Sequence, residues 1–347
     1  MKSGHIRIVN LFVACVMTCA VVFFSTAHAG EILARVQSNG VVRCGVSEGI
    51  AGFSIKDGSG RWTGLDADFC RAVAAAALGD GEKVVFIPLF ASARFPALKA
   101  NRIDLLARNT TQTLGREVNI GTHFAGILYH DGQSFMVPAA SRAQGVRDLD
   151  GASICVVKES THVVHLADYF KAHGLGYQPV IVESVTLAKD EFFAGRCQTY
   201  TSDASILASV RLDAPEGPEM YRILPERISK EPLGPVVNGG DEQWFVIVKW
   251  VLLALIEAEE RSITRENVRQ VLQATTDPAM QAVLDKGGGY AKAMGIGPGW
   301  VVRVVEAVGN YGEMFERNLG SGSPLKIERG LNRLWNQGGL MYSPPFR

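Results

Sequence analysis

Three threonines and an arginine stand close together in the stretch NTTQTLGRE, residues 109–117. The stretch follows the apolar run IDLLA, residues 103–107, which is typical of a buried strand. Threonine hydroxyls donate hydrogen bonds, and the guanidinium of Arg116 can meet a carboxylate with two parallel hydrogen bonds. We therefore expect a small anion near Thr111 and Arg116. The alternative that stays open is that the threonines cap the next helix and Arg116 forms a surface ion pair.

A second stretch, VVKESTHVV at residues 156–164, passes from an expected strand into an expected helix through Ser160 and Thr161. The first N–H groups of a helix are unpaired and carry partial positive charge, so they attract anions. Lys158 adds to this positive field. An N-cap role for Ser160 or Thr161 is compatible with such a site.

A carboxylate also stands at a strand end, because TYTSDAS places Asp203 just after residues 197–201. A carboxylate opposite an arginine–threonine site suits a zwitterion, which carries one group of each sign. The alternative is that Asp203 is only the N-cap of the helix that follows.

The first hundred residues after residue 30 alternate between strands and helices, which predicts a parallel sheet covered by helices. The strands are expected at 41–48, 83–89 and 103–109, with helices at 65–79 and 93–102. The pattern then restarts, with strands at 151–160, 179–184 and 197–203 and helices at 161–174 and 186–196.

Two segments connect these units, 132–141 on the way out and 233–244 on the return. Two crossings predict two lobes joined by a two-strand hinge, with a cleft at the carboxyl ends of both sets of strands. We expect residues 30–135 in lobe 1, 136–234 in lobe 2, and 235–347 back in lobe 1 with a helical C-terminal extension. Within that extension, helices are expected at 244–260 and 300–319, and a loop and helix at 320–336.

The composition gives no sign of a nucleic-acid-binding function. Lysine plus arginine equals aspartate plus glutamate, 35 each, so no basic excess indicates a nucleic-acid partner. Residues 1–29 combine Lys2 and Arg7, an apolar run and an A-x-A pattern at Ala27 and Ala29, which predicts a secretory signal cleaved after Ala29. An uncleaved membrane anchor is the alternative, at the short limit for spanning a bilayer.

Four cysteines remain after that cleavage: Cys44, Cys70, Cys155 and Cys197. An exported chain meets an oxidising compartment, so two disulfides are possible in any of three connectivities. We favour Cys44–Cys70 and Cys155–Cys197 because each pair stays within one half of the chain. Buried free thiols are the alternative, and the spacing suits no zinc site.

The chain resembles the periplasmic amino-acid-binding proteins of ABC importers, and most closely the broad-range L-amino-acid receptors of the polar amino-acid class. The resemblance covers nearly all of residues 33–347. It is carried by several stretches, namely VVRCGVSEGIAGFS, WTGLDADFCRAVAAA, DLLARNTTQTLGRE, GASICVVKEST, FFAGRCQTYTSDAS, SKEPLGPVV, GNYGEMFERNLGSGSPLKIERGLNRLW and GGLMYSPPFR. It implies a two-lobed periplasmic-binding-protein fold of type II.

The resemblance also implies roles for individual residues. Arg116 and Thr111 would hold the α-carboxylate, together with the backbone at Asn109 and the N–H groups near Thr161 and His162. Asp203 would hold the α-ammonium. The remaining wall of the pocket would come from Phe53, Ser47, Glu48 and Ile50 in lobe 1 and from Lys158 and Ser202 in lobe 2.

Three positions depart from the pattern of the family, which often has glycine at Asn109 and Ser160 and a small residue at His162. Glu48 places a charge near the pocket. If Glu48 points inward, it should favour polar or basic side chains; facing solvent is an equally open alternative.

The resemblance implies a receptor that closes on a free L-amino acid and delivers it to an inner-membrane ABC permease, without catalysis and without a cofactor. We expect a monomer in the periplasm. The alternative is an enzyme on the same fold, a cyclohexadienyl or arogenate dehydratase, for which Glu48 is the only visible acid. His162 and His165 lie one helical turn apart without an evident third ligand, so no metal is expected. A sensory module is the third alternative, but no signalling segment follows the lobes.

Overall fold

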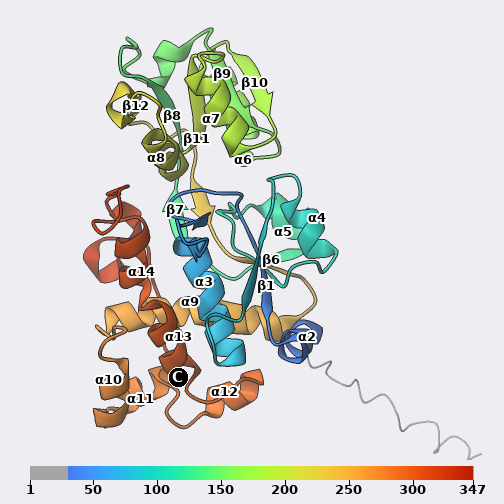
Figure 1. The fold of residues 1–347 in the computed structure, drawn as a ribbon, viewed down its shortest axis with the longest axis vertical. Coiled ribbons are helices and arrows are strands. Elements are labelled where there is room, and N and C mark those ends of the chain that lie inside the picture. Colours follow the sequence, from blue (N-terminus) through green and yellow to red (C-terminus); the bar gives the residue numbers. More distant parts are fainter. Residues whose placement is uncertain (1–29, 347) are drawn as a thin grey trace, which may run out of the picture.

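The computed structural model describes residues 30–346 and shows two α/β lobes, one above the other (Figure 1). The predicted signal peptide, residues 1–29, lies outside the described residues. The two sheets each have five strands and mixed order, so the expected two-lobed α/β class is confirmed.

The sheet of lobe 1 has the strand order β4–β1–β5–β14–β6. β1 (Val42–Val46) is parallel to β4 (Val84–Pro88) and to β5 (Leu105–Leu106), as the alternating pattern predicts. β14 (Val236–Asn238) returns antiparallel between β5 and β6 (Thr122–Phe124). The helices of this part are α2 (Glu31–Asn39), α3 (Leu65–Leu78), α4 (Arg94–Lys99) and α5 (Leu114–Ile120), and a small hairpin pairs β2 (Ile55–Lys56) with β3 (Trp62–Thr63).

The sheet of lobe 2 has the order β10–β9–β11–β8–β12. β9 (Ser153–Val157) is parallel to β10 (Gln178–Val182) and β11 (Thr199–Asp203), whereas β8 (Gln133–Pro138) and β12 (Tyr221–Ile223) run antiparallel to each other. α6 (Thr161–Ala172) follows β9, and α8 (Ala204–Leu212) follows β11, so both helices begin at the carboxyl end of a strand. α7 (Val185–Phe193) connects β10 to β11.

The hinge is an antiparallel pair, β7 (Tyr129–Asp131) with β13 (Glu231–Leu233), that runs between the two lobes (Figure 1). The predicted crossings, 132–141 and 233–244, begin slightly too late. The first crossing was misplaced because the apolar run of β8 looks like a connecting strand, yet β8 pairs with β11 inside the sheet of lobe 2. Lobe 2 therefore starts with β8, a few residues before the predicted boundary at 136.

The C-terminal helices pack against lobe 1, with α10 to α13 toward its end away from lobe 2 and α14 alongside its upper part (Figure 1). They are α9 (Glu242–Glu260), α10 (Val268–Ala274), α11 (Pro278–Val283), α12 (Gly289–Met294), α13 (Trp300–Val308) and α14 (Tyr311–Asn318). α13 and α9 both lie against α3. Within residues 30–346, no helix is both long and apolar enough to cross a bilayer.

The single helix predicted for 300–319 is in fact two helices. Gly309 adopts a φ of 82°, and Asn310 begins α14 with a capping box, in which its Oδ1 accepts from the N–H of Glu313 at 2.9 Å. The apolar spacing continues through the break, which explains why the pattern predicted one helix. The segment 320–336 forms only 3-10 turns, Gly330–Asn332 and Trp335–Gln337, instead of the expected helix.

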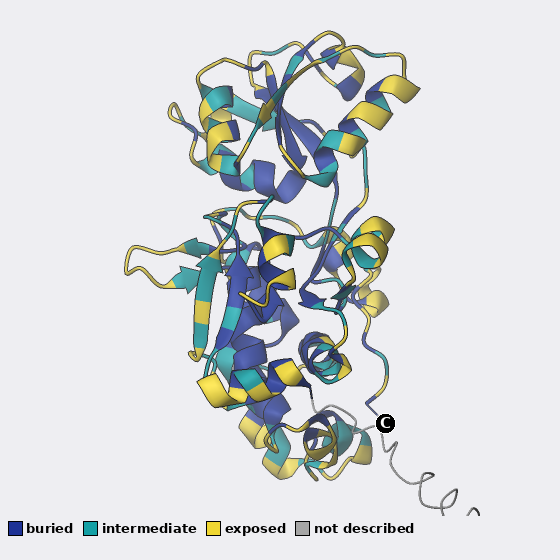
Figure 2. Ribbon diagram, turned by 90° about the vertical axis from the view of Figure 1, so that its right-hand side faces the viewer, coloured by how far each residue is buried: buried dark blue, intermediate teal, exposed yellow. Residues whose placement is uncertain are grey.

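The central strands of both sheets and the inner faces of the helices are buried, as the dark segments of Figure 2 show, whereas the edge strands β4, β10 and β12 are partly exposed. Trp244 and Trp300 are among the largest fully buried side chains, and both belong to the C-terminal helices. The indole N–H of Trp244 donates to the carbonyl of Asp104 at 2.8 Å, which attaches α9 to the sheet of lobe 1. The helical extension is therefore part of the core of lobe 1.

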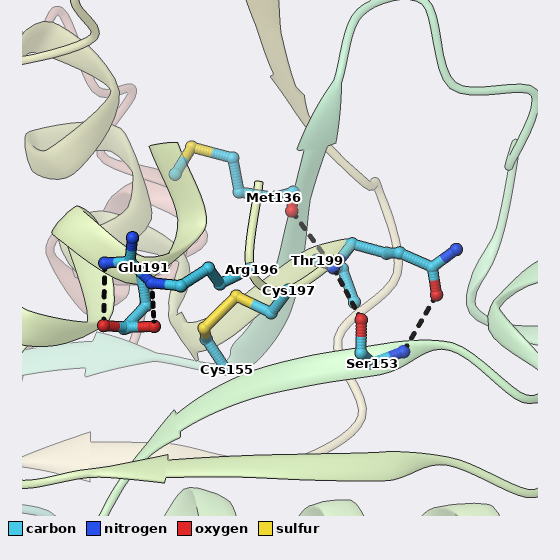
Figure 3. Close-up of a disulfide and its surroundings, with 8 residues drawn as sticks. Met136, Ser153, Cys155, Glu191, Arg196, Cys197 and Thr199 are labelled. Atoms are coloured by element: carbon cyan, nitrogen blue, oxygen red, sulfur yellow. Dashed lines mark hydrogen bonds and ion pairs between the residues drawn. A yellow bond between two sulfur atoms is a disulfide. The ribbon is translucent and has the colours of Figure 1, made fainter. Parts of the chain in front are cut away.

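Both favoured disulfides are present, Cys44–Cys70 in lobe 1 and Cys155–Cys197 in lobe 2. The first joins β1 to α3. The second joins β9 to Cys197, just before β11, and lies near Ser153 and Thr199 (Figure 3). Each bond lies within one lobe, so neither restricts the hinge.

Candidate functional site

A cleft between the lobes collects residues from the carboxyl ends of both sheets. Its wall contains predicted residues from lobe 1 and from lobe 2, namely Ile50, Asn109, Thr111, Arg116, Thr161, His162, Ser202 and Asp203. The free volume is about 30 Å³, enough for only a few water molecules. The lobes must therefore part to admit any organic ligand.

Arg116 is held in this wall by the start of α5. Thr113 is the N-cap of the helix, and its hydroxyl accepts from the N–H of Arg116 at 3.2 Å. The Arg116 guanidinium donates to the carbonyl of Thr111 and lies 5.4 Å from the ring of Phe95. Burial lowers the pKa of Arg116 to about 10, which leaves it charged at neutral pH. Thr113 thus does cap the helix, but in the described chain Arg116 has no carboxylate within ion-pair distance.

The loop before α5 turns sharply at Asn109, whose φ is 35°. Asparagine tolerates this left-handed conformation, which glycine adopts most easily. The N–H of Asn109 donates to Asp66 at 2.8 Å, and burial raises the pKa of Asp66 to about 7. This contact fixes the loop that carries Thr111 into the cleft.

The start of α6 faces the same cleft from lobe 2. Ser160 occupies the N-cap position, but its hydroxyl donates to the carbonyl of Val157 at 2.6 Å and does not cap the helix. Thr161 donates to Glu231 at 2.9 Å, and its hydroxyl lies 3.5 Å from that of Thr111 across the cleft. The first N–H groups of α6 therefore keep their positive character toward the cleft.

Asp203 lies at the end of β11 and is almost fully buried. It occupies the N-cap position of α8, yet its carboxylate makes no capping hydrogen bond. Instead, Asp203 Oδ1 lies 3.0 Å from His162 Nε2. Burial by itself lowers the pKa of His162. The charge of the Asp203 carboxylate and its hydrogen bond raise this pKa by more, so that the pKa of His162 lies above its usual value.

Glu231, which the sequence analysis missed, is fully buried at the start of the hinge strand β13. It accepts hydrogen bonds from Ser229 at 2.6 Å and from Thr161, and it lies 2.8 Å from His165 Nδ1. Burial raises its pKa, but these hydrogen bonds and the charge of His162 outweigh burial and lower it to about 2. Glu231 is therefore a charged link between the hinge and α6.

Three of these groups could in principle hold a metal, because ligand atoms of His162, Asp203 and Glu231 lie within 4.8 Å of one another. Each of them already has a hydrogen-bonding partner in the cleft. His165, which the sequence places beside His162, pairs with Glu231 instead. The arrangement is that of a polar network that positions α6 against the hinge.

Two further arginines, Arg94 and Arg108, line the cleft and were also missed. Arg108 pairs with Glu48 at 3.2 Å and donates to the carbonyl of Leu89 at 2.7 Å. Arg94 is 4% exposed, and no acidic side chain of residues 30–346 lies within ion-pair distance of it. Burial and the charges of Arg116 and Arg108 lower the pKa of Arg94 well below its usual value.

Four of the predicted residues are not in the cleft wall. Glu48 faces Arg108, and burial raises its pKa. Ser47 bonds to Ser54, with their hydroxyl oxygens 2.5 Å apart, and Phe53 packs edge-on against Tyr129 at 5.6 Å. Lys158 is half exposed and pairs with Glu183 at 3.1 Å. Ser47 and Phe53 therefore lie behind the cleft wall, and Lys158 lies at the protein surface.

The missed residues carried weak signals. Arg94 stands in ASARFPALK, where a helix pattern accounts for an arginine without any site. Glu231 stands in SKEPLGPVV, which contributed only to the family resemblance and lies just before the predicted connection 233–244. A buried charge in a connecting segment could have been suspected only from the Pro232 that follows it, since proline favours an extended strand there.

Comparisons with known proteins identify the family of this chain. The model of the bacterial extracellular solute-binding proteins, family 3, matches residues 42–288. The general L-amino acid-binding periplasmic protein AapJ of Rhizobium johnstonii is 46% identical over 325 residues, which are 93% of this chain and 95% of that protein. The glutamate/glutamine/aspartate/asparagine-binding protein BztA of Rhodobacter capsulatus is 43% identical over 92% of this chain and 95% of its own length.

A solved structure is similar over nearly the same range. It is a periplasmic binding protein of an ABC transporter from Brucella ovis with glutathione bound, 44% identical, with a TM-score of 0.88 over 91% of this chain and 99% of that one. The chain therefore belongs to the bacterial extracellular solute-binding proteins, family 3.

Proposed function

We propose that this protein binds free L-amino acids in the cleft between its lobes and delivers them to an inner-membrane ABC permease. One observation carries the proposal: Arg116 from lobe 1 and Asp203 from lobe 2, of opposite charge, line the same cleft. In the described chain Arg116 has no acidic partner, and Asp203 is not used as a helix cap. The names of AapJ and BztA, which are amino-acid-binding proteins, support this choice of ligand.

Arg116 would hold the α-carboxylate with its guanidinium. Thr111 and the uncapped N–H groups at Thr161 and His162 would complete the carboxylate site, because each offers a donor from the wall of the cleft. Asp203 would hold the α-ammonium. These contacts involve only the groups that all L-amino acids share, which allows a broad range of ligands.

The side-chain preference differs from the one that Glu48 alone suggested. Glu48 is neutralised by Arg108, whereas Arg94 brings a buried positive charge without an acidic partner in the described chain. We propose that the pocket prefers acidic and uncharged polar side chains, with Arg94 as their partner. The name of BztA and the glutathione bound to the Brucella ovis protein support this preference, since both concern glutamate or a glutamyl compound.

Binding would couple to closure through the hinge. A ligand that touches both lobes stabilises the closed arrangement, because those contacts exist only when the lobes are together. β7 and β13 provide two short connections about which the lobes can rotate. The disulfides lie inside the lobes and would not oppose this rotation.

The proposal is tested by isothermal titration of the purified protein with L-glutamate, L-glutamine and L-arginine. Arg116→Ala leaves a carboxylate unpaired in a desolvated cleft, so we expect a loss of about 2–5 kcal/mol in binding free energy. Arg102→Ala removes an exposed arginine of the same lobe and serves as the control. A change of less than about tenfold in Kd for Arg116→Ala contradicts the assignment.

Arg94→Gln tests the side-chain preference separately. It should weaken the binding of L-glutamate by roughly tenfold or more and affect L-glutamine less, because only glutamate loses a hydrogen bond between two opposite charges. An equal loss for both ligands would assign Arg94 to the structure of the cleft and not to selectivity.

We propose that the protein acts as a monomer in the periplasm, after cleavage behind Ala29, and without a nucleic-acid partner. Cleavage would leave a nearly balanced formal charge, which supports the absence of a nucleic-acid role. The dehydratase alternative is not supported, since the family and the relatives named above are solute-binding proteins. Size-exclusion chromatography with light scattering tests the oligomeric state.

A further inference from the structure

A second cavity, of about 490 Å³, lies between lobe 1 and the C-terminal helices. We call it the seam cavity. One wall comes from the β2–β3 hairpin and the first turns of α3, and the other from α13, α14 and the loop behind α14. The residues that line it are Ala51, Gly52, Ile55, Arg61, Thr63, Gly64, Asp68, Arg71, Arg265, Ala307, Arg317, Asn318, Ser323, Pro324 and Leu325.

The seam cavity has more positive than negative charge. Four arginines line it, whereas Asp68 is its only acidic lining residue among those described. Arg317 forms an ion pair with Asp68, with Nη2 2.6 Å from Oδ2. Arg61 forms an ion pair with Glu82 at 2.7 Å, and Glu82 does not itself line the cavity. Two guanidiniums are less well paired: Arg71 shares Asp68 and Glu82 with Arg317 and Arg61 at longer distances, and the Arg265 side chain makes no ion pair within residues 30–346.

Arg71 is one of these two, and its position is unusual. Its residue is 4% exposed, yet within residues 30–346 it donates no hydrogen bond, and its Nε is buried without a partner. The nearest carboxylate oxygens are 3.6 Å from Nη1 in Asp68 and 3.5 Å from Nε in Glu82. A buried guanidinium without hydrogen bonds is costly, and an anion in the cavity would supply the missing acceptors.

Arg265 is the second of these two arginines. It reaches the cavity from the segment before α10 and donates to the carbonyl of Ala307. Its side chain is exposed, so its remaining N–H groups are free to approach a ligand from the opposite wall. An anion between Arg71 and Arg265 would therefore join lobe 1 to the C-terminal helices.

The seam cavity is separate from the amino-acid cleft. The loop of residues 50–53 divides them: Ile50 lines the cleft, whereas Ala51 and Gly52 line the seam cavity. Moreover, α13 and α14 lie beyond residue 288, where the match to the family model ends. The general family site thus does not account for the charges collected here.

We propose that the seam cavity is a second binding site, which takes a small oxyanion with two or more negative charges, such as a phosphate compound or a polycarboxylate. Arg71 and Arg265 supply the hydrogen-bond donors from the two walls. The volume is within the range of small-molecule sites. The proposal goes beyond the amino-acid site and does not depend on it.

The test is isothermal titration of the mature chain, without an amino acid present, with pyrophosphate and with citrate in separate experiments. Arg71→Gln and Arg265→Gln each remove one donor group, and we expect each to raise Kd by about tenfold or more. Arg269→Gln is the matched control, because Arg269 is exposed on α10, pairs with Glu306 and lies outside the cavity. It should bind as the wild type does.

Saturable binding of either anion that both cavity variants weaken supports the proposal, and the stronger anion identifies the phosphate or the carboxylate class. No saturable binding to the wild-type protein overturns it, as does unchanged binding by both variants. If Arg71→Gln does not fold, Arg265→Gln decides the question, because its side chain is exposed. Each variant is also titrated with L-glutamate, so that failure of the amino-acid site is seen independently.

Discussion

His162 Nε2 lies 3.0 Å from Asp203 Oδ1, and both side chains are almost fully buried at the cleft. The two residues are 41 positions apart and come from different elements, the first turn of α6 and the end of β11. The pair places an ionisable ring directly on the carboxylate that we assign to the ligand ammonium. His162 thus holds Asp203 in position, and it competes with the ligand ammonium for the Asp203 carboxylate.

The His162–Asp203 pair should make stability depend on pH. The pKa of His162 is raised in the folded protein, so the pair's contribution is full below the ordinary histidine pKa and is lost as the pH rises through the raised value. We expect His162→Gln to lower the free energy of unfolding more at about pH 5.5 than at about pH 9, as measured by urea denaturation without ligand. A pH-independent difference contradicts a charged pair. His173→Gln, on the exposed end of the same helix, is the control.

Asp203→Asn should remove most of the preference of the protein for ligands with an α-ammonium group over ligands without one. The wild type should bind L-glutamate much more tightly than the same acid without its amino group, by roughly 2–5 kcal/mol for a buried charge pair. In Asp203→Asn the two ligands should bind with similar Kd, as measured by titration. If the variant still prefers the amino acid by the wild-type factor, Asp203 does not hold the ammonium.

The sequence predicted those parts of the molecule that local patterns determine. The strands β1, β4, β9 and β11 follow from short apolar runs, and the helices α3 and α6 follow from longer apolar spacing that ends near a glycine. The position of the cleft followed from topology, since the carboxyl ends of parallel strands meet at one edge.

The partners of the charged side chains could not be predicted in the same way. The pairing of Glu48 with Arg108 joins residues 60 positions apart, and that of Thr161 with Glu231 joins residues 70 apart. No local pattern specifies such contacts. For this reason the expected role of Glu48 changed, and Arg94 and Glu231 were found only in the folded arrangement.

The disulfide Cys155–Cys197 should contribute strongly to the stability of lobe 2. It closes a loop with a sequence separation of 42 residues, for which the chain-entropy model gives about 4 kcal/mol. We expect Cys155→Ala combined with Cys197→Ala to lower the free energy of unfolding by this order and to leave amino-acid binding in place, because neither cysteine lines the cleft. The measurement is chemical denaturation with and without a reducing agent. A variant as stable as the oxidised wild type contradicts the prediction.

Gly30 should tolerate no side chain. It is buried at the start of α2, and its N–H donates to Gln243 Oε1 at 2.7 Å. A Cβ at this position would collide with the carboxylate of Asp241. That carboxylate cannot easily move aside, because it accepts from the N–H of Ile32 at 2.8 Å and from that of Trp244 at 2.9 Å.

We expect Gly30→Ala to lower the free energy of unfolding by about 1–3 kcal/mol, as for other overpacked sites. Glu31→Ala, at the exposed next position, is the control and should change stability by less than about 0.5 kcal/mol. The proposed cleavage behind Ala29 would place a positively charged amino group at Gly30, next to Gln243 Oε1, and intact-mass measurement of the exported protein reveals whether it begins there. A mature chain that begins elsewhere, or a Gly30→Ala variant as stable as the wild type, contradicts this account of the N-terminus.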